Sequence, residues 1–152
     1  MSGLCNKSLF WETFPHVPSL KGLPIAALSQ RDPQTAATLA AVKRFNAAFT
    51  KYDVPAIMVP MTDDCLFDHT RPPLDGERFE GQAAVPAFWE AFFHRSPQAR
   101  FETEDIFAAG DRCVVRWVYH WLRDSRPGRV RGVDIFRVRD GQIAEKLSYV
   151  KG

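Results

Sequence analysis

The sequence predicts an α+β domain, in which helices come first along the chain and an antiparallel sheet follows. Two observations lead to this prediction. Apolar residues in the first half recur at helical spacing, and the last third holds four strand-like segments in a row. Those segments are separated by the turn residues Gly110-Asp111, 125–128 and Asp140-Gly141, and Asp-Gly is a strong signal for a two-residue hairpin.

The helices are predicted from their start signals and apolar stripes. Asp32-Pro33 is a good helix start, and a helix over about 33–51 follows from apolar residues three and four apart. Asp53 caps a short second helix over 53–60. The third helix covers 81–94. The apolar stripes of the first and third helices consist of Leu39, Val42, Phe45, Phe49 and Tyr52, and of Val85, Phe88, Trp89 and Phe92.

Five strands are predicted, and their alternation assigns faces. They cover 65–71, which is ended by Pro72-Pro73, and then 99–108, 112–123, 129–139 and 142–150. Arginines occupy odd positions of 129–139, so Asp134 should point inward with Phe136 and Val138. In 112–123 the aromatic, inward face carries Cys113, Val115, Trp117, Tyr119 and Trp121.

The pairing of these strands is less strongly determined. A two-residue turn at Asp140-Gly141 pairs Asp134 with Leu147 and points Ile143, Glu145, Leu147 and Tyr149 inward, whereas a bulge would reverse every one of these assignments. In the preceding hairpin, a four-residue turn places Tyr119 opposite Asp134, and a five-residue turn places His120 there. Both alternatives stay open.

Residues 1–31 differ from the rest of the chain. They contain Pro15, Pro18 and Pro24 and show no clear period, so we expect an arm that is extended or partly disordered. The folded domain is predicted to cover 32–152.

Composition excludes several classes of protein. The chain has 152 residues, of which 45% are hydrophobic and 25% charged, with a net charge of +2, so we expect neither a nucleic-acid partner nor a membrane partner. Cys5, Cys65 and Cys113 show no metal-ligand or disulfide spacing, which fits a reducing compartment. No apolar run approaches the roughly 18 residues of a membrane span, and no secretory signal is apparent. We therefore expect a cytoplasmic protein without a metal or cofactor.

From about 34 to 151 the chain resembles the SnoaL-like branch of the nuclear transport factor 2-like superfamily. The stretches that carry the resemblance are FNAAFTKYDVPAI, a strand with Asp68-His69, FEGQAAVPAFWEAFF, FETEDIFAAGDRCVVRWVYHW and, most specifically, GVDIFRVRDGQIAEKLSY. The resemblance implies a cone, in which a curved antiparallel sheet wraps around the long first helix and encloses an apolar cavity. The superfamily includes cyclases, isomerases, dehydratases and members without known activity, so the fold alone says little about function.

The resemblance also implies catalytic roles. In the cyclases, an Asp on the strand before the last is the acid/base, and Asp134 matches it. A His one strand earlier also takes part, and His120 lies near the matching place. Relatives often read Glu-His-Trp-Asp after the final hairpin, where this chain has Glu145-Lys146-Leu147-Ser148. Three of these four residues therefore depart from the family pattern.

These arguments give a set of candidate site residues, and several of them also have a purely structural explanation. Asp134, His120 and Tyr119 are the candidate catalytic residues. Asp134 is otherwise a hydrogen-bonded structural carboxylate, His120 an outer-face histidine and Tyr119 a packing residue. Glu145 either adds a second carboxylate, lies solvated at the cavity mouth or forms an ion pair with an arginine. The candidate ligand-binding residues are Phe45, Phe49, His69, Trp89, Phe92, Trp117, Trp121, Phe136, Glu145 and Tyr149.

The sequence leads to one leading hypothesis and two alternatives. The first is a cofactor-free enzyme that acts on a hydrophobic, carbonyl-bearing small molecule by acid/base proton transfer, as an isomerase, cyclase or dehydratase. The second is a non-catalytic binding protein of the same fold, and the third is a protein-interaction adaptor. A homodimer through the outer face of the sheet is expected from the family and from the half-apolar back faces of the strands.

Overall fold

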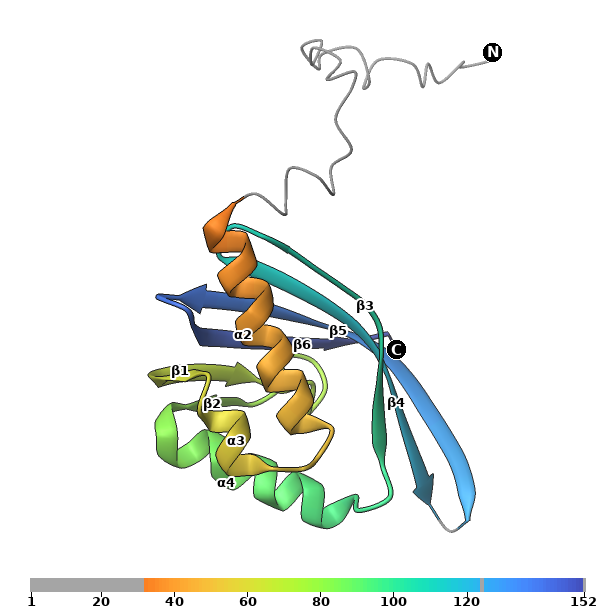
Figure 1. Ribbon diagram of the computed structural model, residues 1–152. Helices are drawn as coiled ribbons and strands as arrows, with labels where there is room; N and C mark the ends of the chain where they lie inside the picture. Colours follow the sequence, from red (N-terminus) through yellow and green to blue (C-terminus); the bar gives the residue numbers. More distant parts are fainter. Residues whose placement is uncertain (1–31, 124, 152) are drawn as a thin grey trace, which may run out of the picture.

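The computed structural model describes residues 32–123 and 125–151, and the predicted arm over 1–31 lies outside this part (Figure 1). Its helices are α2 (Pro33–Phe49), α3 (Val54–Met58) and α4 (Gly81–Arg95). Each of the first two begins where an aspartate caps it: Asp32 accepts from the backbone amides of Gln34 and Thr35, and Asp53 from Ala56. The three predicted helices are thus confirmed, with the first two shorter than expected.

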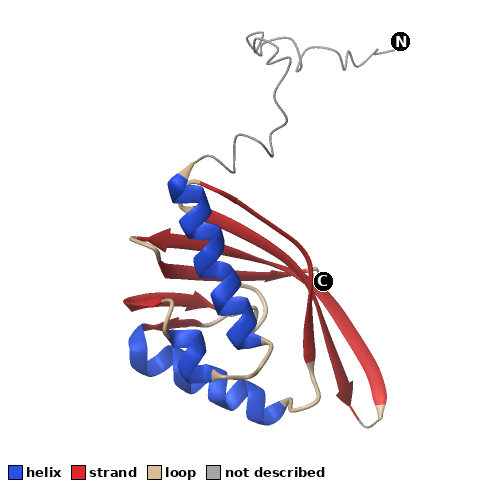
Figure 2. Ribbon diagram, in the orientation of Figure 1, coloured by secondary structure: helices blue, strands red, loops and turns tan. Residues whose placement is uncertain are grey.

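A six-stranded sheet packs against these helices, in the order β2-β1-β6-β5-β4-β3. Its strands are β1 (Met61–Asp68), β2 (Arg78–Glu80), β3 (Arg100–Ala109), β4 (Arg112–Arg123), β5 (Arg126–Arg139) and β6 (Gln142–Val150). The short strand β2 was not predicted. In Figures 1 and 2 the helices cover one face of the sheet, where α2 packs on β3–β6 and α4 on β1 and β2.

The sheet is mixed, because β1 runs parallel to β6 while every other pair is antiparallel. This corrects the expectation of a wholly antiparallel sheet. β1 follows the short helix α3 rather than a hairpin, so no tight turn imposes an antiparallel direction on it. The α+β class and the helix against the curved sheet are confirmed.

The turn between β4 and β5 is shorter than either predicted alternative. Arg123 pairs with Arg126, and this places Val115 opposite Asp134, while Tyr119 faces Val130 and His120 faces Arg129. Both predicted pairings of Asp134 with the preceding strand were therefore wrong. The alternation of faces survives, since Cys113, Val115 and Trp117 are buried on the inner side.

A β-bulge near the last hairpin reverses the predicted faces of β6. Val138 pairs with Ile143 but Arg137 pairs with Glu145, so Ala144 has no partner on β5. Beyond the bulge every side chain of β6 points to the face opposite the predicted one. Asp134 pairs with Ser148 rather than Leu147. Lys146 and Ser148 consequently point inward, and Glu145, Leu147 and Tyr149 point outward.

The core lies between α2, α4 and the inner face of the sheet, and it is strongly aromatic. Phe49 contacts Trp89, Phe93 and Phe101 at centroid distances of 5.1, 5.1 and 5.0 Å. Phe45 packs edge-on against Phe136 at 5.4 Å. None of the helices in 32–123 and 125–151 has the length and apolar character needed to cross a membrane.

Candidate functional site

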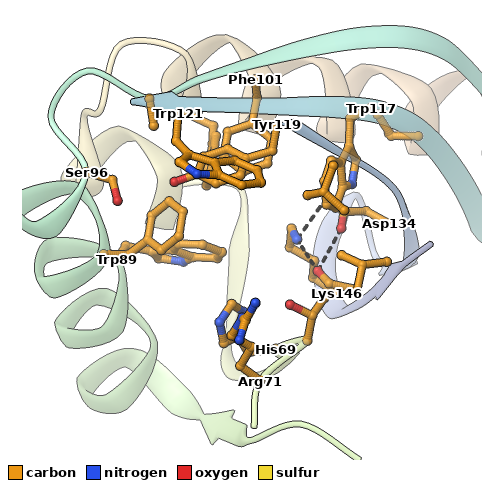
Figure 3. Close-up of a pocket in the computed structure, with 18 of the residues that line it drawn as sticks. His69, Arg71, Trp89, Ser96, Phe101, Trp117, Tyr119, Trp121, Asp134 and Lys146 are labelled. Carbon is orange, nitrogen blue, oxygen red and sulfur yellow. Dashed lines mark hydrogen bonds and ion pairs between the residues drawn. The ribbon is translucent and has the colours of Figure 1, made fainter. Parts of the chain in front are cut away.

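A cavity of about 1440 Å³ opens between α2, α4 and the inner face of the sheet (Figure 3). Its walls are largely aromatic. The predicted ligand-binding residues that line it are Phe45, Phe49, His69, Trp89, Phe92, Trp117 and Trp121, and the candidate catalytic residues that line it are Asp134 and Tyr119. Lys146 and Ser148 also line it, so the inward residues of β5 and β6 reach the cavity together.

Asp134 is buried and held by two residues of the neighbouring strand. Its residue exposure is 8%, and its carboxylate oxygen Oδ2 lies 2.9 Å from Lys146 Nζ. The Ser148 hydroxyl donates to Asp134 Oδ1 at 2.7 Å, and Lys146 Nζ donates to Ser148 Oγ at 2.7 Å. The dashed lines in Figure 3 show part of this closed network. A buried carboxylate is thus stabilised by one opposite charge and one hydroxyl.

The Lys146 ammonium lies among aromatic rings. Its nitrogen is 4.8 Å from the ring centroid of Phe67, 5.5 Å from Trp89 and 5.8 Å from Phe136. Such contacts favour a cation over an aromatic face. Burial lowers the pKa of Lys146, and the adjacent Asp134 carboxylate opposes this shift. The pair therefore offers a donor and an acceptor in a largely apolar setting.

Two indole nitrogens at the cavity are buried and lack hydrogen-bond partners among the described residues. They are Nε1 of Trp89 and Nε1 of Trp117, and both tryptophans line the cavity. Leaving a buried donor unpaired costs free energy, about 1–3 kcal/mol per group. A ligand oxygen in the cavity is one means of satisfying either donor.

His69 lies at the side of the cavity near the end of β1. Its ring is 4.7 Å from Phe88 and 5.8 Å from Phe67. Burial, followed by the positive charges of Lys146, Arg71 and Arg95, lowers the pKa of His69 from 6.5 to about 4. His69 is consequently neutral at physiological pH and presents one N–H donor and one acceptor nitrogen.

Tyr119 and His120, which the sequence offered as partners of Asp134, do not meet it. Tyr119 sits on the cavity wall against Phe101 at 4.6 Å, but it is four residues along β4 from Val115, the residue opposite Asp134, or roughly 13 Å of strand. His120 points to the outer face, where its Nε2 is 3.4 Å from the Glu102 carboxylate.

Three predicted ligand-binding residues lie outside the cavity lining. Glu145 pairs with Arg137 and lies 3.7 Å from Arg112 on the outer face, which agrees with the predicted alternative of an ion pair with an arginine. Tyr149 is 55% exposed on that same face. Phe136 is fully buried in the core beneath the cavity.

Sequence reasoning missed Lys146 and Ser148 because it paired β5 with β6 without a bulge. A signal was present: a carboxylate in an apolar strand is stabilised by a buried cation, and Lys146 is the lysine of the adjoining strand. The bulge also brings Glu145 opposite Arg137, a favourable cross-strand pair. Within 32–123 and 125–151, no three His, Cys, Asp or Glu side chains converge as metal ligands.

Comparison with known proteins agrees with this architecture. The family model for the SnoaL-like domain matches residues 42–146. A nuclear transport factor 2-like protein of unknown function from Mesorhizobium loti is 36% identical, with a TM-score of 0.70, over 80% of this chain and 96% of that one. No curated protein gives a significant match.

Two more distant structures share the fold. A proposed SnoaL-like polyketide cyclase from Jannaschia sp. CCS1 is 19% identical, with a TM-score of 0.69, over 80% of this chain and 90% of that one. A proposed ketosteroid isomerase from Kribbella flavida is 15% identical, with a TM-score of 0.66, over 77% of this chain and 79% of that one. At these identities the likeness concerns the fold alone.

Proposed function

Because the chain belongs to the SnoaL-like domain family, we propose that it is a small enzyme that moves protons on a hydrophobic, carbonyl-bearing small molecule without a cofactor. Isomerisation, cyclisation and dehydration are the candidate reactions. The observation that carries the proposal is Asp134, a carboxylate held among aromatic rings at the wall of a large cavity. Groups in such settings are suited to acid/base work.

Asp134 acts as the base in this proposal. Its two oxygens each accept one hydrogen bond, from Lys146 and from Ser148, which fixes the carboxylate plane and leaves lone pairs for a substrate proton. The proton leaves a carbon next to the substrate carbonyl and passes to Asp134, and its electron pair moves onto the carbonyl oxygen. In a β,γ-unsaturated substrate the product is a dienolate; return of the proton to its γ-carbon moves the C=C bond into conjugation, re-forms the carbonyl and completes an isomerisation.

Lys146 and Trp117 stabilise the negative charge that develops on that oxygen. The Lys146 ammonium has three protons, of which two are directed to Asp134 and Ser148, so one is left for a ligand oxygen. The unpartnered Trp117 indole N–H adds a second donor beside Asp134 (Figure 3). Donors fixed in place before the reaction stabilise such an oxyanion most effectively in a dry site.

The test measures proton abstraction directly, so it does not require the natural substrate. The full-length protein is incubated in D₂O with an apolar ketone, 2-tetralone, and deuterium uptake next to the carbonyl is followed by NMR. Asp134→Asn should reduce the accelerated exchange by about 10²-fold or more. Glu90→Gln, the same change at an exposed position of α4, should leave it unchanged. Exchange that survives in Asp134→Asn ends the proposed mechanism.

The second candidate is a binding protein of the same fold. The observation that favours it is the completeness of the Asp134 network, since a carboxylate already paired with Lys146 and Ser148 also has a purely structural explanation. It predicts that apolar ligands bind in the cavity while wild-type protein gives no faster deuterium uptake than buffer.

A further inference from the structure

We propose that Arg71, Arg95 and His69 form an anion site at the cavity mouth, which selects ligands whose apolar body ends in a carboxylate. This inference rests on the small-molecule cavity of the proposed function and names the substrate class that the cavity takes. It concerns binding, and does not depend on proton transfer by Asp134.

The charges that line the cavity do not balance. Among the described residues that line it, Asp134 is the only acidic one, and it is matched by Lys146 at 2.9 Å. The arginines Arg71, Arg95 and Arg129 line it as well. Arg129 pairs with the outward-facing His120 on the neighbouring strand, so its side chain belongs to the outer face. Arg71 and Arg95 remain as uncompensated cations at the mouth.

Seven other arginines of the described chain form ion pairs, whereas Arg71 and Arg95, like Arg44, Arg126 and Arg129, do not. The paired ones are Arg78, Arg100, Arg112, Arg116, Arg131, Arg137 and Arg139. Arg71 and Arg95 have no ion pair within 32–123 and 125–151, although Glu77 lines the smaller hollow that both also border. Their guanidinium groups are therefore available to an anionic ligand.

His69, Arg71 and Arg95 share one corner, because all three line both the cavity and the smaller hollow beside it. The positive charges of Arg71 and Arg95 both act on the imidazole and, after burial and Lys146, help to lower the pKa of His69. In Figure 3, His69 and Arg71 lie together, across the cavity from Phe101 and Tyr119. A neutral imidazole among cations is a suitable donor to an incoming anion, because it adds a hydrogen bond without further repulsion.

Stabilisation of α4 explains why a cation stands at position 95, but it does not explain Arg71. Arg95 is the last residue of α4, where a cation interacts favourably with the helix dipole. Arg71 is in the loop after β1 and receives no such stabilisation. The two elements are separated by more than twenty residues of sequence yet supply cations to the same opening.

The chemistry of the site points to a carboxylate on an aromatic or alicyclic body. Guanidinium groups bind carboxylates through paired, charge-assisted hydrogen bonds. Across the cavity from His69 and Arg71, Tyr119 and Trp121 provide flat apolar walls 5.4 Å apart, and Phe92 lies 5.9 Å from Tyr119 (Figure 3). A ligand anchored at the mouth by its carboxylate would extend its apolar body toward Lys146 and Asp134.

The experiment compares two probes of nearly equal shape, 2-naphthoate and 2-naphthamide, on the full-length protein. Binding is followed by quenching of the tryptophans that line the cavity and confirmed by calorimetry. At about 50 mM salt the carboxylate should bind at least about tenfold more tightly, and the preference should shrink as salt is raised. Arg71→Gln and Arg95→Gln should each reduce the preference, and the double variant should abolish it.

Arg44→Gln is the matched control, because it removes the same charge from an exposed position of α2 outside the cavity. It should keep the preference. Equal affinity for the two probes, no binding of either at about 1 mM, or a preference that persists in the double variant would overturn the anion site. Asp134→Asn should keep the preference even where it abolishes deuterium uptake, so the two proposals fail separately.

Discussion

At the scale of single residues, the site is built around one buried charge pair. Asp134 and Lys146 are each costly to bury alone, and each is tolerated because the other lies 2.9 Å away. The Ser148 hydroxyl donates to the other oxygen of the Asp134 carboxylate, so both carboxylate oxygens are held in place. Removing one partner leaves the other as a buried charge without its counter-ion.

Lys146→Met should therefore destabilise the fold by about 3–5 kcal/mol, because it leaves the Asp134 carboxylate buried and unpaired. Asp134→Asn added to Lys146→Met should recover much of that loss, giving a strong coupling in a double-mutant cycle. Urea unfolding measures both effects. Lys43→Met, an exposed lysine on α2, is the control and should change little; a loss in Lys146→Met no larger than the control contradicts the role of the pair.

A second residue-scale prediction concerns pH. The pKa of His69 is lowered from 6.5 to about 4 in the folded protein, so between these values the unfolded chain binds more protons. Folding stability should fall as pH drops through this window and be fully regained above pH 6.5. Thermal unfolding of wild type and His69→Gln from pH 7 to about 4 tests this. The variant should lose less stability on acidification, and parallel curves would refute the prediction.

At the scale of elements, a single unpaired residue decides what faces the cavity. The bulge at Ala144 turns Lys146 and Ser148 toward Asp134 and sends Glu145 to Arg137. Glycines on the inward face of β5 complete the arrangement, because they let indole rings lie over the strand. A Cβ at Gly132 would lie 2.2 Å from the Trp117 ring and 2.6 Å from the Tyr149 carbonyl oxygen.

Gly132→Ala should consequently push the Trp117 indole from its place and destabilise the protein by about 1–3 kcal/mol. The displaced ring should also change the tryptophan emission and weaken binding of apolar probes in the cavity. Trp117→Phe in the Gly132→Ala background should recover part of the stability, since the smaller ring relieves the ring contact. Unfolding curves that match wild type would show that β5 shifts freely at this point.

At the scale of the whole molecule, the two faces of the sheet differ in the side chains that they carry. The inner face holds the cavity, and the outer face carries apolar side chains among ion pairs. Those apolar side chains include Phe107 and Tyr149, which are 54% and 55% exposed, with the half-buried Val133, Ile135 and Leu147 nearby. Apolar residues grouped on one face of a sheet are typical of an interface.

We propose that this outer face joins two copies of the chain. Sedimentation of the wild type should give a dimer, and Phe107→Glu with Tyr149→Glu should give a monomer with similar thermal stability, since both side chains are largely exposed. Val59→Glu places the same charge at a position 77% exposed at the end of α3, outside the strands, and should remain dimeric. A monomeric wild type would disprove the proposed interface.

The amino-acid sequence by itself determined the class of fold, the three helices, the inward direction of Asp134 and most of the aromatic cavity wall. These follow from periodicity, caps and turn residues, which act within a few neighbouring positions. Only the tertiary structure decided which groups meet Asp134 and that Arg71 and Arg95 share one opening. A bulge reverses the faces of a whole strand and a shortened turn shifts its register, although each changes local energy little. Their placement therefore depends on charge pairing and packing between distant segments.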